Sequence, residues 1–347
     1  MTRAPSRRAA LAALLALATL PAAACVPDDP GGPADHRLLL AAFSASRDLF
    51  ERELIPAFTA DHLARTGERV RIDSSYLASG AQARAVEAGF EADIVVLALA
   101  PDIDRLAAAA LITHDWRARP HAGIFATTPV AFAVRPGNPQ RITSWPDLAR
   151  PGVSVLMPNP RTSGGAMWNA AALHGAAIRG HAGVPPHDPA AAATYLHRVL
   201  RNVAILDKAA RESIITFEKG VGDVAITYES EIVAGRLAGR HYDTVIPPSP
   251  LLVEIPAATV DAYTTRHGTQ ALAAAFLDFL QTPAAQRSLA RYGFRPVDPT
   301  LAPETAPMPA DALRIADLGG WPEVQKTLFG KGGLFTRTWE SVYSEDP

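Results

Sequence analysis

Short, fully apolar segments alternate with helix-like segments along this chain of 347 residues. Residues 37–44 (RLLLAAFS) and 92–100 (ADIVVLALA) are almost wholly apolar, as expected for strands that are buried on both faces. After the first of them, Phe50, Leu54 and Phe58 recur at four-residue spacing, which is typical of a helix with one apolar face. Repeated strand–helix–strand units predict an α/β protein whose sheet is mostly parallel and covered by helices.

The same alternation continues through the rest of the chain. Further strands are expected at residues 152–160, 202–207 and 222–231, and a long helix is expected at residues 269–280. A chain of this length exceeds what one small core usually supports, so two lobes are expected. Many of the 30 prolines lie in connecting segments such as VDPTLAPETAPMPA, which is typical of surface loops or linkers.

The N-terminus has the pattern of an export signal. Three arginines within the first eight residues precede an uncharged apolar run, residues 9–20, which is too short to span a bilayer as a stable helix. Three alanines (22–24) and the only cysteine, Cys25, follow. This ending resembles the lipobox of bacterial lipoproteins, so Cys25 is expected to carry lipid as the first mature residue. Plain cleavage is the alternative, and Arg7-Arg8 leave export by the twin-arginine route open beside the general route.

The charge balance argues against nucleic-acid binding. The formal net charge is -2, and removing the three arginines of residues 1–24 from this total leaves a mature chain of -5. A nucleic-acid-binding surface would need a basic footprint, which this balance does not favour. One cysteine cannot form an internal disulfide, so stability must come from packing.

Motifs that would indicate an enzyme are missing from the sequence. None of the ten histidines forms an H-x-x-x-H pair, and neither a G-x-S-x-G elbow nor a phosphate-binding G-x-x-x-x-G-K loop occurs. No metal or cofactor is expected. Carboxylate pairs stay open because 35 acidic residues offer many pairings, although most of them are expected on solvated helix faces.

Three predicted junctions between a strand and a helix share one chemistry. At Ser44, at Ser79 and at residues 162–165 (Thr-Ser-Gly-Gly), an apolar strand ends in small hydroxyl or glycine residues and a helix begins. The free N–H groups and the dipole of a helix N-terminus attract anions, and glycine lets an oxygen approach the backbone. Any one of these serines is explained as a helix N-cap. Three together indicate an anion site where strand ends converge.

Several stretches of the sequence resemble those of one known family. They include FSASRDLFEREL, LASGAQARAVEAGFEADIVVLALAPDID, RNVAILDKAAR, GVGDVAITYESE and GGWPEVQKTLFGKGG. From about Leu38 to the C-terminal helix, the chain resembles the sulfate/thiosulfate-binding proteins of bacterial ABC importers. The N-P-R-T-S-G-G block at 159–165, with R-P-G-N-P and W-P-D-L ahead of it, is specific to that family.

The resemblance implies a two-lobed periplasmic-binding-protein clamshell. Each lobe would be a mostly parallel or mixed sheet flanked by helices, with crossing strands as the hinge. A fully ionised tetrahedral dianion would lie between the lobes, held by uncharged donors only. The expected organisation is a signal peptide (1–24), a flexible linker (25–35), lobe I (36–128 and 250–298), lobe II (129–249), and a Pro-rich crossing segment with a C-terminal helix (299–347).

Five ligand-binding residues follow from the resemblance, motif by motif. The serine hydroxyl of the family corresponds to Ser79, and the donors of its T-S-G-G block correspond to Ser163, Gly164 and Gly165. The backbone donor of a third motif corresponds to Ala210, within KAAR. All five positions match the family's pattern.

Two further ligand positions depart from the family. Ser44 stands where the family has an aspartate, and Tyr228 stands where the family has a tryptophan that donates its indole N–H. A phenol can accept as well as donate a hydrogen bond, so Tyr228 could soften the rejection of protonated anions such as hydrogen phosphate. Arg47 and Arg211 are expected to brace the binding loops behind the ligand rather than to touch it.

The resulting expectation is a monomeric binding protein in the periplasm or at the cell surface, attached to the membrane only through its N-terminal lipid. It would capture sulfate or thiosulfate and deliver the anion to the permease and ATPase subunits of an ABC importer. Molybdate, tungstate or phosphate are alternative ligands. An anion sensor or an enzyme on the same scaffold are alternatives of a different class.

Overall fold

The computed structural model describes residues 35–301 and 311–343. The predicted signal peptide and Cys25 lie outside these residues. The strands are β1 (Asp35–Phe43), β2 (Arg69–Leu77), β3 (Ile94–Val96), β4 (Ile124–Val134), β5 (Val155–Pro158), β6 (Val203–Asp207), β7 (Val224–Tyr228), β8 (Asp243–Val245), β9 (Leu252–Thr259) and β10 (Arg295–Pro296). The helices are α1 (Arg47–Leu49), α2 (Ile55–Thr66), α3 (Ser79–Glu87), α4 (Ala100–Ala108), α5 (Gly164–Ile178), α6 (Pro189–Arg201), α7 (Ala210–Glu218), α8 (Glu229–Leu237), α9 (Asp261–His267), α10 (Gln270–Leu280), α11 (Pro283–Arg291), α12 (Gly320–Val324) and α13 (Leu334–Tyr343).

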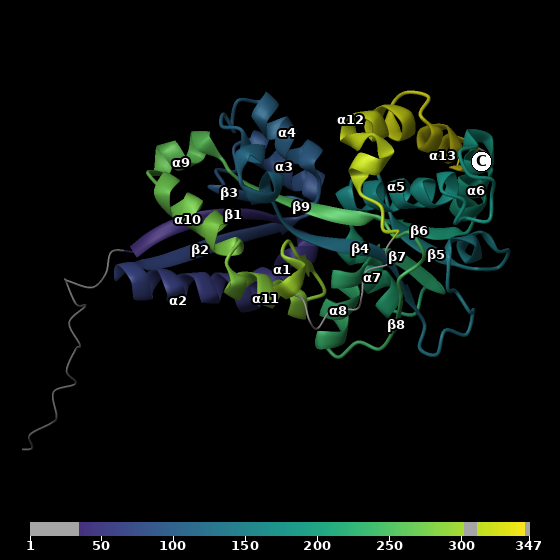
Figure 1. The fold of residues 1–347 in the computed structure, drawn as a ribbon, viewed down its shortest axis with the longest axis horizontal. Coiled ribbons are helices and arrows are strands. Elements are labelled where there is room, and N and C mark those ends of the chain that lie inside the picture. Colours follow the sequence, from purple (N-terminus) through teal and green to yellow (C-terminus); the bar gives the residue numbers. More distant parts are fainter. Residues whose placement is uncertain (1–34, 302–310, 344–347) are drawn as a thin grey trace, which may run out of the picture. The chain divides into compact units, whose positions relative to one another are not determined.

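The strands form a mixed sheet with the order β2-β1-β3-β9-β4-β7-β5-β6, and β8 and β10 pair with β4 (Figure 1). We call β2, β1, β3 and β9 the first half of the sheet, and β4, β7, β5 and β6 the second half. Each half contains a parallel trio, β2-β1-β3 or β6-β5-β7, whose strands connect through helices. This is the mixed α/β sheet that the sequence predicts.

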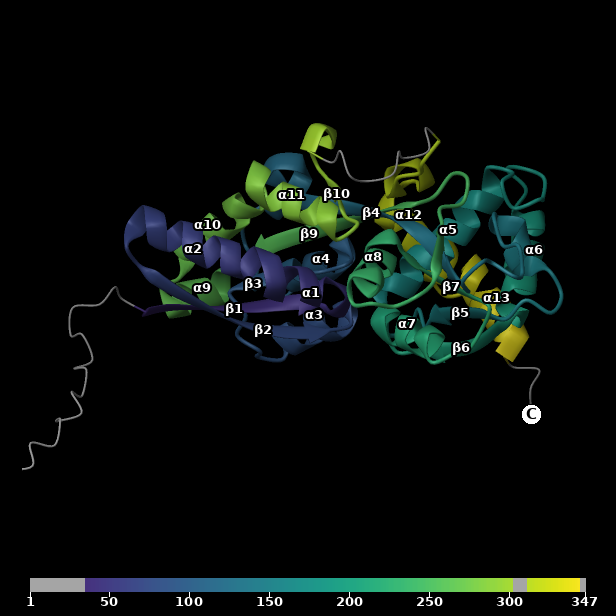
Figure 2. The ribbon, with the colours of Figure 1, turned by 90° about the horizontal axis from the view of Figure 1, so that it is seen from below.

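The two halves join where β4 and β9 run side by side in antiparallel pairing (Figure 2). From Ile124 to Pro129, β4 pairs with β9, and from Val130 to Val134 it pairs with β7. Pro129 lies at the change of partner, where its missing N–H removes no hydrogen bond from a regular ladder. These two strands therefore connect the halves covalently and by backbone hydrogen bonds.

Both faces of the sheet are covered, which explains why its strands are apolar throughout. In the first half, Leu38 and Leu40 of β1 pack with α2 and α10, whereas Ala41 packs on the opposite face with α3, α4 and α9. In the second half, Ala131 of β4 packs with α7 and α8, and Phe132 packs with α5 and α6 on the other face. Side chains that alternate along a strand thus enter different cores.

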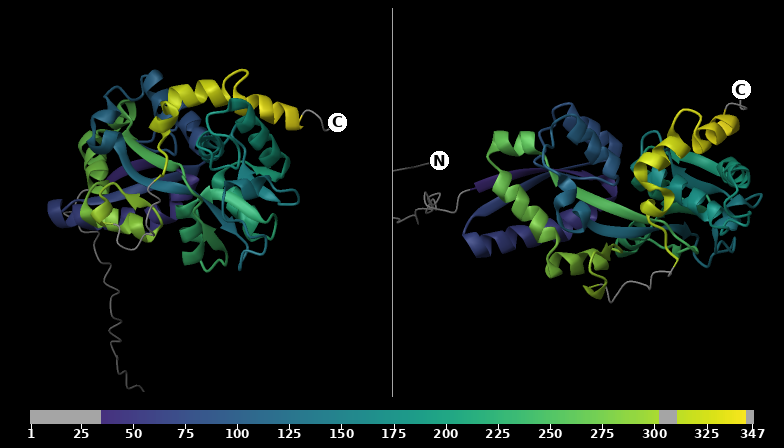
Figure 3. Two further views of the ribbon diagram at one scale, coloured as in Figure 1. Left: turned by 45° about the vertical axis from the view of Figure 1, so that its right-hand side comes forward. Right: turned by 45° about the horizontal axis from the view of Figure 1, so that its top comes forward.

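The C-terminal helices cover the second half of the sheet from the side of α5 and α6 (Figure 3). Helix α13 packs against α6. The ring of Trp321 in α12 stands edge-on to the ring of Trp168 in α5, with 4.7 Å between the ring centroids. The segment GGWPEVQKTLF is helical between glycines, as predicted, but its second part, Gln325–Phe329, forms a wider π-helical turn.

Three element predictions need correction. The predicted strand at 92–100 contains only the three residues of β3, because α4 already begins at Ala100. The predicted strand at 222–231 ends at Tyr228, and α8 begins at the next residue. The predicted strand at 152–160 is reduced to Val155–Pro158. An apolar run by itself cannot show where a strand ends, because residues beyond the strand can stay buried, as Leu97–Leu99 and Glu229–Glu231 do.

Candidate functional site

A small cavity lies where the carboxyl ends of strands from both halves of the sheet meet. It has a volume of about 10 Å³, roughly the room for one water molecule. Its lining comes from the segments that follow β1, β2, β3, β5, β6 and β7. The lining residues are Phe43, Ser44, Ala45, Ala78, Ser79, Ala98, Ser163, Gly165, Ala209, Ala210 and Tyr228.

The structure brings the predicted ligand residues together. Ser44, Ser79, Ser163, Gly165, Ala210 and Tyr228 all line this one cavity. Gly164 lies beside it: a Cβ atom on Gly164 would be 3.3 Å from the Cβ of Ser79 and 3.0 Å from the side chain of Leu99. The starts of α5 and α3 are therefore in contact, although α5 belongs to the second half of the sheet and α3 to the first.

Sequence reasoning missed the other lining residues, which are four alanines (45, 78, 98 and 209) and Phe43. They carry no polar side chain, so nothing in their chemistry marks them as site residues. What they share is position: each is the last residue of a strand or lies within two residues of a strand end. The signal that could have found them is the strand end itself, since ligands bind beyond the carboxyl ends of strands in such sheets.

Several helices point their N-termini at the cavity without a capping side chain. The N-cap residues of α3, α5, α7 and α8 are Ala78, Ser163, Ala209 and Tyr228, and none of their side chains caps its helix. By contrast, Asp188 caps α6 with its carboxylate. In α8 the N–H of Ser230 already donates to the Thr128 hydroxyl over 3.2 Å. The first turns of α3, α5 and α7 leave backbone N–H donors available, and the helix dipoles add positive potential. These donors and dipoles suit an anion better than a cation.

No charged side chain is among the residues that line the cavity. A buried anion costs several kcal/mol unless fixed donors surround it, and here backbone N–H groups and hydroxyls are the available donors. Such neutral donors can hold an anion that is fully ionised at the working pH, and they supply neither a proton nor a counter-ion.

Ser79 is held in place by two hydrogen bonds. Its hydroxyl donates to Oδ2 of Asp102 over 2.5 Å and accepts the N–H of Ala98 over 3.0 Å. Burial raises the pKa of Asp102, while the hydrogen bond from Ser79 lowers it in part. Asp102, in α4, therefore fixes the orientation of the Ser79 hydroxyl. No motif around Asp102 indicates this role.

Tyr228 supplies a buried hydroxyl that has no partner among the described residues. The side chain is 1 % exposed, and its Oη lies 2.8 Å from where a Cβ of Gly165 would be. Burial raises the pKa of the Tyr228 phenol, and the nearby Glu231 carboxylate raises it further. The phenol consequently stays protonated and can donate. A buried hydroxyl without a partner is unfavourable in the free protein and indicates that a ligand completes its hydrogen bonding.

Arg47 and Arg211 lie outside the cavity, in a wider cleft that adjoins it and shares Ser44. The Arg211 guanidinium donates to Glu231 over 3.1 Å and also lies 4.0 Å from Asp48. The Arg47 guanidinium lies over the ring of Tyr76, 5.7 Å from its centroid. Arg211 thus connects α7 and α8 of the second half to α1 of the first.

Glu231 makes protein stability depend on pH. Burial raises its pKa to about 7, and Arg211 offsets only part of this. The folded state therefore holds the Glu231 proton more tightly than the unfolded state. Its contribution to stability is complete below the ordinary glutamate pKa and is lost as the pH rises to about 7.

The Glu231→Gln variant is expected to remove this dependence. Gln keeps the size and can accept the Arg211 hydrogen bond, but it does not titrate. Relative to the wild type, the variant should gain on the order of 2 kcal/mol in free energy of unfolding between pH 5 and pH 8. Denaturant unfolding at several pH values measures this, and parallel curves for the two proteins would contradict it.

A hydrogen bond also joins the two halves beside the cavity. The indole N–H of Trp168, in α5, donates to the backbone carbonyl of Ala98 over 2.6 Å. Ala98 follows β3 in the first half, and both residues are buried. The same carbonyl belongs to a residue that lines the cavity, so the bond fixes the position of one wall.

The described part of the chain contains neither a metal-binding cluster nor a helix that could span a membrane. Within residues 35–301 and 311–343, no three His, Cys, Asp or Glu side chains are grouped so as to hold a metal ion. Among the helices of the same residues, none has the length and apolarity needed to cross a bilayer.

The fold is that of a solute-binding protein, and sequence comparison gives its family. The model of the family "Bacterial extracellular solute-binding protein" matches residues 38–295, and the chain belongs to that family. The "Sulfate-binding protein" of Synechococcus elongatus is 40% identical over 311 residues, which cover 87% of this chain and 86% of the relative. The "Thiosulfate-binding protein" of Escherichia coli is 34% identical over 310 residues, which cover 85% of this chain and 89% of the relative.

Solved structures agree with the fold. The sulfate-binding protein SubI from Mycobacterium tuberculosis matches with a TM-score of 0.77 and 37% identity, over 85% of this chain and 99% of that one. A periplasmic thiamin binding protein matches with a TM-score of 0.62 at 15% identity, which supports the fold only. The predicted two-lobed fold class of periplasmic binding proteins is thereby confirmed.

Proposed function

We propose that this protein captures sulfate, or its close relative thiosulfate, outside the cytoplasm and delivers it to an ABC importer. The observation that carries the proposal is the cavity: uncapped helix N-termini from both halves of the sheet converge on it together with the unpartnered hydroxyl of Tyr228. The names of the relatives that cover most of the chain support the same ligand class.

Seven residues are proposed to hold the anion. Ser44, Ser79, Ser163, Gly164, Gly165, Ala210 and Tyr228 would donate through backbone N–H groups or hydroxyls. Ser79 would donate through its backbone N–H, because its hydroxyl proton goes to Asp102. The cavity has room for little more than one water molecule, so the two halves must separate slightly to admit four oxygens and a sulfur. Arg47 and Arg211 would brace the surrounding loops, because Arg211 is already engaged by Glu231.

The lobes are proposed to close over the ligand about β4 and β9. Lobe I would comprise residues 36–128 and 250–298, and lobe II residues 129–249. The change of partner of β4 between Pro129 and Val130 supports this boundary. Closure removes water from around the anion, which strengthens its hydrogen bonds, and presents both lobes to the permease at once.

The protein is proposed to act as a monomer without covalent chemistry, tethered by lipid on Cys25 and working with permease and ATPase subunits. A lining without a histidine, a cysteine or a charged side chain supports binding rather than catalysis. Intact mass measurement of the mature N-terminus tests the tether, and a mature chain without lipid would overturn that part.

Calorimetry at fixed pH tests the ligand. Sulfate, thiosulfate, phosphate and molybdate are titrated separately into the purified protein, and sulfate or thiosulfate is expected to bind most tightly. Sulfate should also raise the Tm, since a ligand that binds only the folded state stabilises it. The absence of heat and of a thermal shift with all four anions would overturn the proposed function. Phosphate titrations at pH 6 and pH 8 show whether Tyr228 accepts a hydrogen bond from a protonated ligand: if it does, phosphate affinity rises as the pH falls.

The Tyr228→Phe variant isolates the phenol. Losing one donor to the anion is expected to weaken sulfate binding about tenfold. The free protein should keep its Tm or gain slightly, because a buried hydroxyl without a partner among the described residues is removed. Calorimetry and thermal unfolding measure the two effects, and unchanged affinity would show that the phenol does not contact the ligand.

A further inference from the structure

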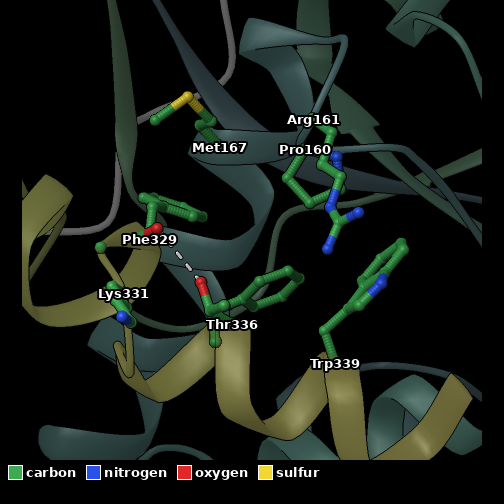
Figure 4. A pocket seen from close by; sticks show the side chains of 9 residues that line it. Pro160, Arg161, Met167, Phe329, Lys331, Thr336 and Trp339 are labelled. Atoms are coloured by element: carbon green, nitrogen blue, oxygen red, sulfur yellow. Dashed lines mark hydrogen bonds between the residues drawn. The ribbon is translucent and has the colours of Figure 1, made fainter. Parts of the chain in front are cut away.

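A second pocket lies away from the cavity, between the loop that precedes α5 and the C-terminal helices (Figure 4). Its volume is about 340 Å³, within the ~300–1,000 Å³ that small-molecule sites occupy. One wall is Pro160, Arg161 and Met167, and the other comes from the Gln325–Phe329 turn and α13. The Thr336 hydroxyl donates to the carbonyl of Phe329 over 3.1 Å, which ties the turn to α13.

The pocket has apolar and aromatic walls. Met167, Phe329, Phe335 and Trp339 line it, and the rings pack in sequence: Phe329 and Phe335 have centroids 5.7 Å apart, and Phe335 and Trp339 have centroids 5.9 Å apart. These tilted rings hold one another in place, so the wall is preformed. Such a surface favours the apolar body of a ligand.

The polar groups of the pocket are donors. Arg161 and Lys331 lie at its rim, and no acidic side chain is among its lining residues. Among the described residues, neither cation makes an ion pair and the indole N–H of Trp339 has no hydrogen-bond partner. Figure 4 shows the Arg161 guanidinium on the side of the pocket where the Trp339 indole lies. A guanidinium beside a free indole N–H suits a planar or tetrahedral anionic headgroup.

We propose that this pocket is a second ligand site and takes an amphiphilic organic anion: a sulfonate, sulfate ester or carboxylate that carries an apolar body the size of one ring. The headgroup binds at Arg161 and Trp339, and the body packs against Met167, Phe329 and Phe335. Inorganic sulfate lacks the apolar part and cannot fill the walls, so the two sites differ in ligand class. The site is independent of the proposed function of the cavity.

Benzenesulfonate is the probe for this site, with excess sulfate present so that the cavity is occupied. The full chain is labelled with ¹³C-methyl methionine, because Met167 lines the pocket while Met157, in β5, is buried in the core. Benzenesulfonate is expected to shift the Met167 methyl signal and to leave the Met157 signal in place. A Met167→Leu variant assigns the signal.

The variants test the headgroup and the wall. Arg161→Gln should weaken benzenesulfonate binding about fivefold, and Trp339→Leu about tenfold, through loss of the indole and its N–H. Arg337→Gln is the control, because it removes an equal charge that lies on α13 outside this pocket. The affinity of this variant for benzenesulfonate should match that of the wild type. Neutral benzyl alcohol should bind about fivefold more weakly than benzenesulfonate.

An unmoved Met167 signal, or equal affinity in the wild type and Arg161→Gln, overturns the second site. Arg161 is exposed, so its substitution leaves the fold intact and the test valid even where Trp339→Leu fails to fold. The sulfate titration is a separate measurement: a protein that ignores sulfate but binds benzenesulfonate would refute the proposed function and support this inference.

Discussion

The Gly165→Ala variant is expected to fold and to bind sulfate roughly 100-fold more weakly than the wild type, a loss of about 3 kcal/mol. Gly165 stands in the first turn of α5 and lines the cavity. A Cβ atom there would lie 2.8 Å from Oη of Tyr228 and 3.0 Å from the Cβ of Ala210. The methyl group thus takes up the space in which an oxygen of the ligand must sit.

The substitution also costs stability, but less than it costs binding. Tyr228 is rigid and buried, so it can yield only by displacing its neighbours, and overpacking of this kind costs about 1–3 kcal/mol. Alanine is a better helix former than glycine, which returns up to about 1 kcal/mol within α5. The Tm should therefore fall by a few degrees while calorimetry detects little or no sulfate binding.

Gly80→Ala is the matched control. Gly80 also stands in the first turn of a helix at the cavity, α3, but its added Cβ would meet only Arg84 at 3.4 Å and Asp102 at 3.7 Å, which are ordinary contacts. This variant should bind sulfate within a few-fold of the wild type. If Gly165→Ala binds sulfate as tightly as Gly80→Ala does, the ligand does not lie against the start of α5.

The sequence alone was sufficient for the parts of the site that have a distinctive local chemistry. Ser44, Ser79 and Ser163 stand where an apolar strand is followed by small residues and a helix. This pattern predicts a helix N-terminus at each serine, whether or not the serine caps it. Ala210 and Tyr228 came from the resemblance to a family, because an alanine and a tyrosine after an apolar run are not distinctive. All five line the cavity in the structure.

Long-range contacts were beyond sequence reasoning. Asp102 lies 23 residues from Ser79, and nothing in its own segment indicates that it accepts the serine's hydrogen bond. The same holds for the contact of Trp168 with Ala98, 70 residues apart, which joins the two halves. The second pocket depends on α13, and no pattern in the sequence distinguished this helix from the rest of the C-terminal segment. Each of these features follows from packing between elements rather than from a pattern within one.

Substitution of Trp168 tests how the two halves of the sheet are held together at the cavity. Trp168 is fully buried, its indole N–H donates to the carbonyl of Ala98 across the two halves, and its ring packs on Trp321. Trp168→Phe keeps most of the ring but leaves the Ala98 carbonyl without this donor. We expect a loss of about 1–3 kcal/mol in free energy of unfolding.

Sulfate affinity should fall as well, about fivefold to tenfold, because Ala98 lines the cavity. The bond between Trp168 and Ala98 forms only when the halves are closed, so its loss destabilises the closed arrangement, which binds sulfate, and leaves the open one unchanged. Trp168→Ala adds an unfilled space and should cost about 3–5 kcal/mol of stability. Thermal unfolding and calorimetry on the same samples measure both quantities.

Trp145→Phe separates the two effects. Trp145 is equally buried, donates its indole N–H to the carbonyl of Pro248 over 2.6 Å, and stands edge-on to Phe132 with 5.0 Å between centroids. This arrangement matches that of Trp168, except that all three residues belong to proposed lobe II. The control should lose similar stability and keep its affinity for sulfate. Because both substitutions remove the same groups, a fall in affinity in Trp168→Phe alone would assign it to the bond between the halves, whereas equal affinities in the two variants would mean that this bond takes no part in closure.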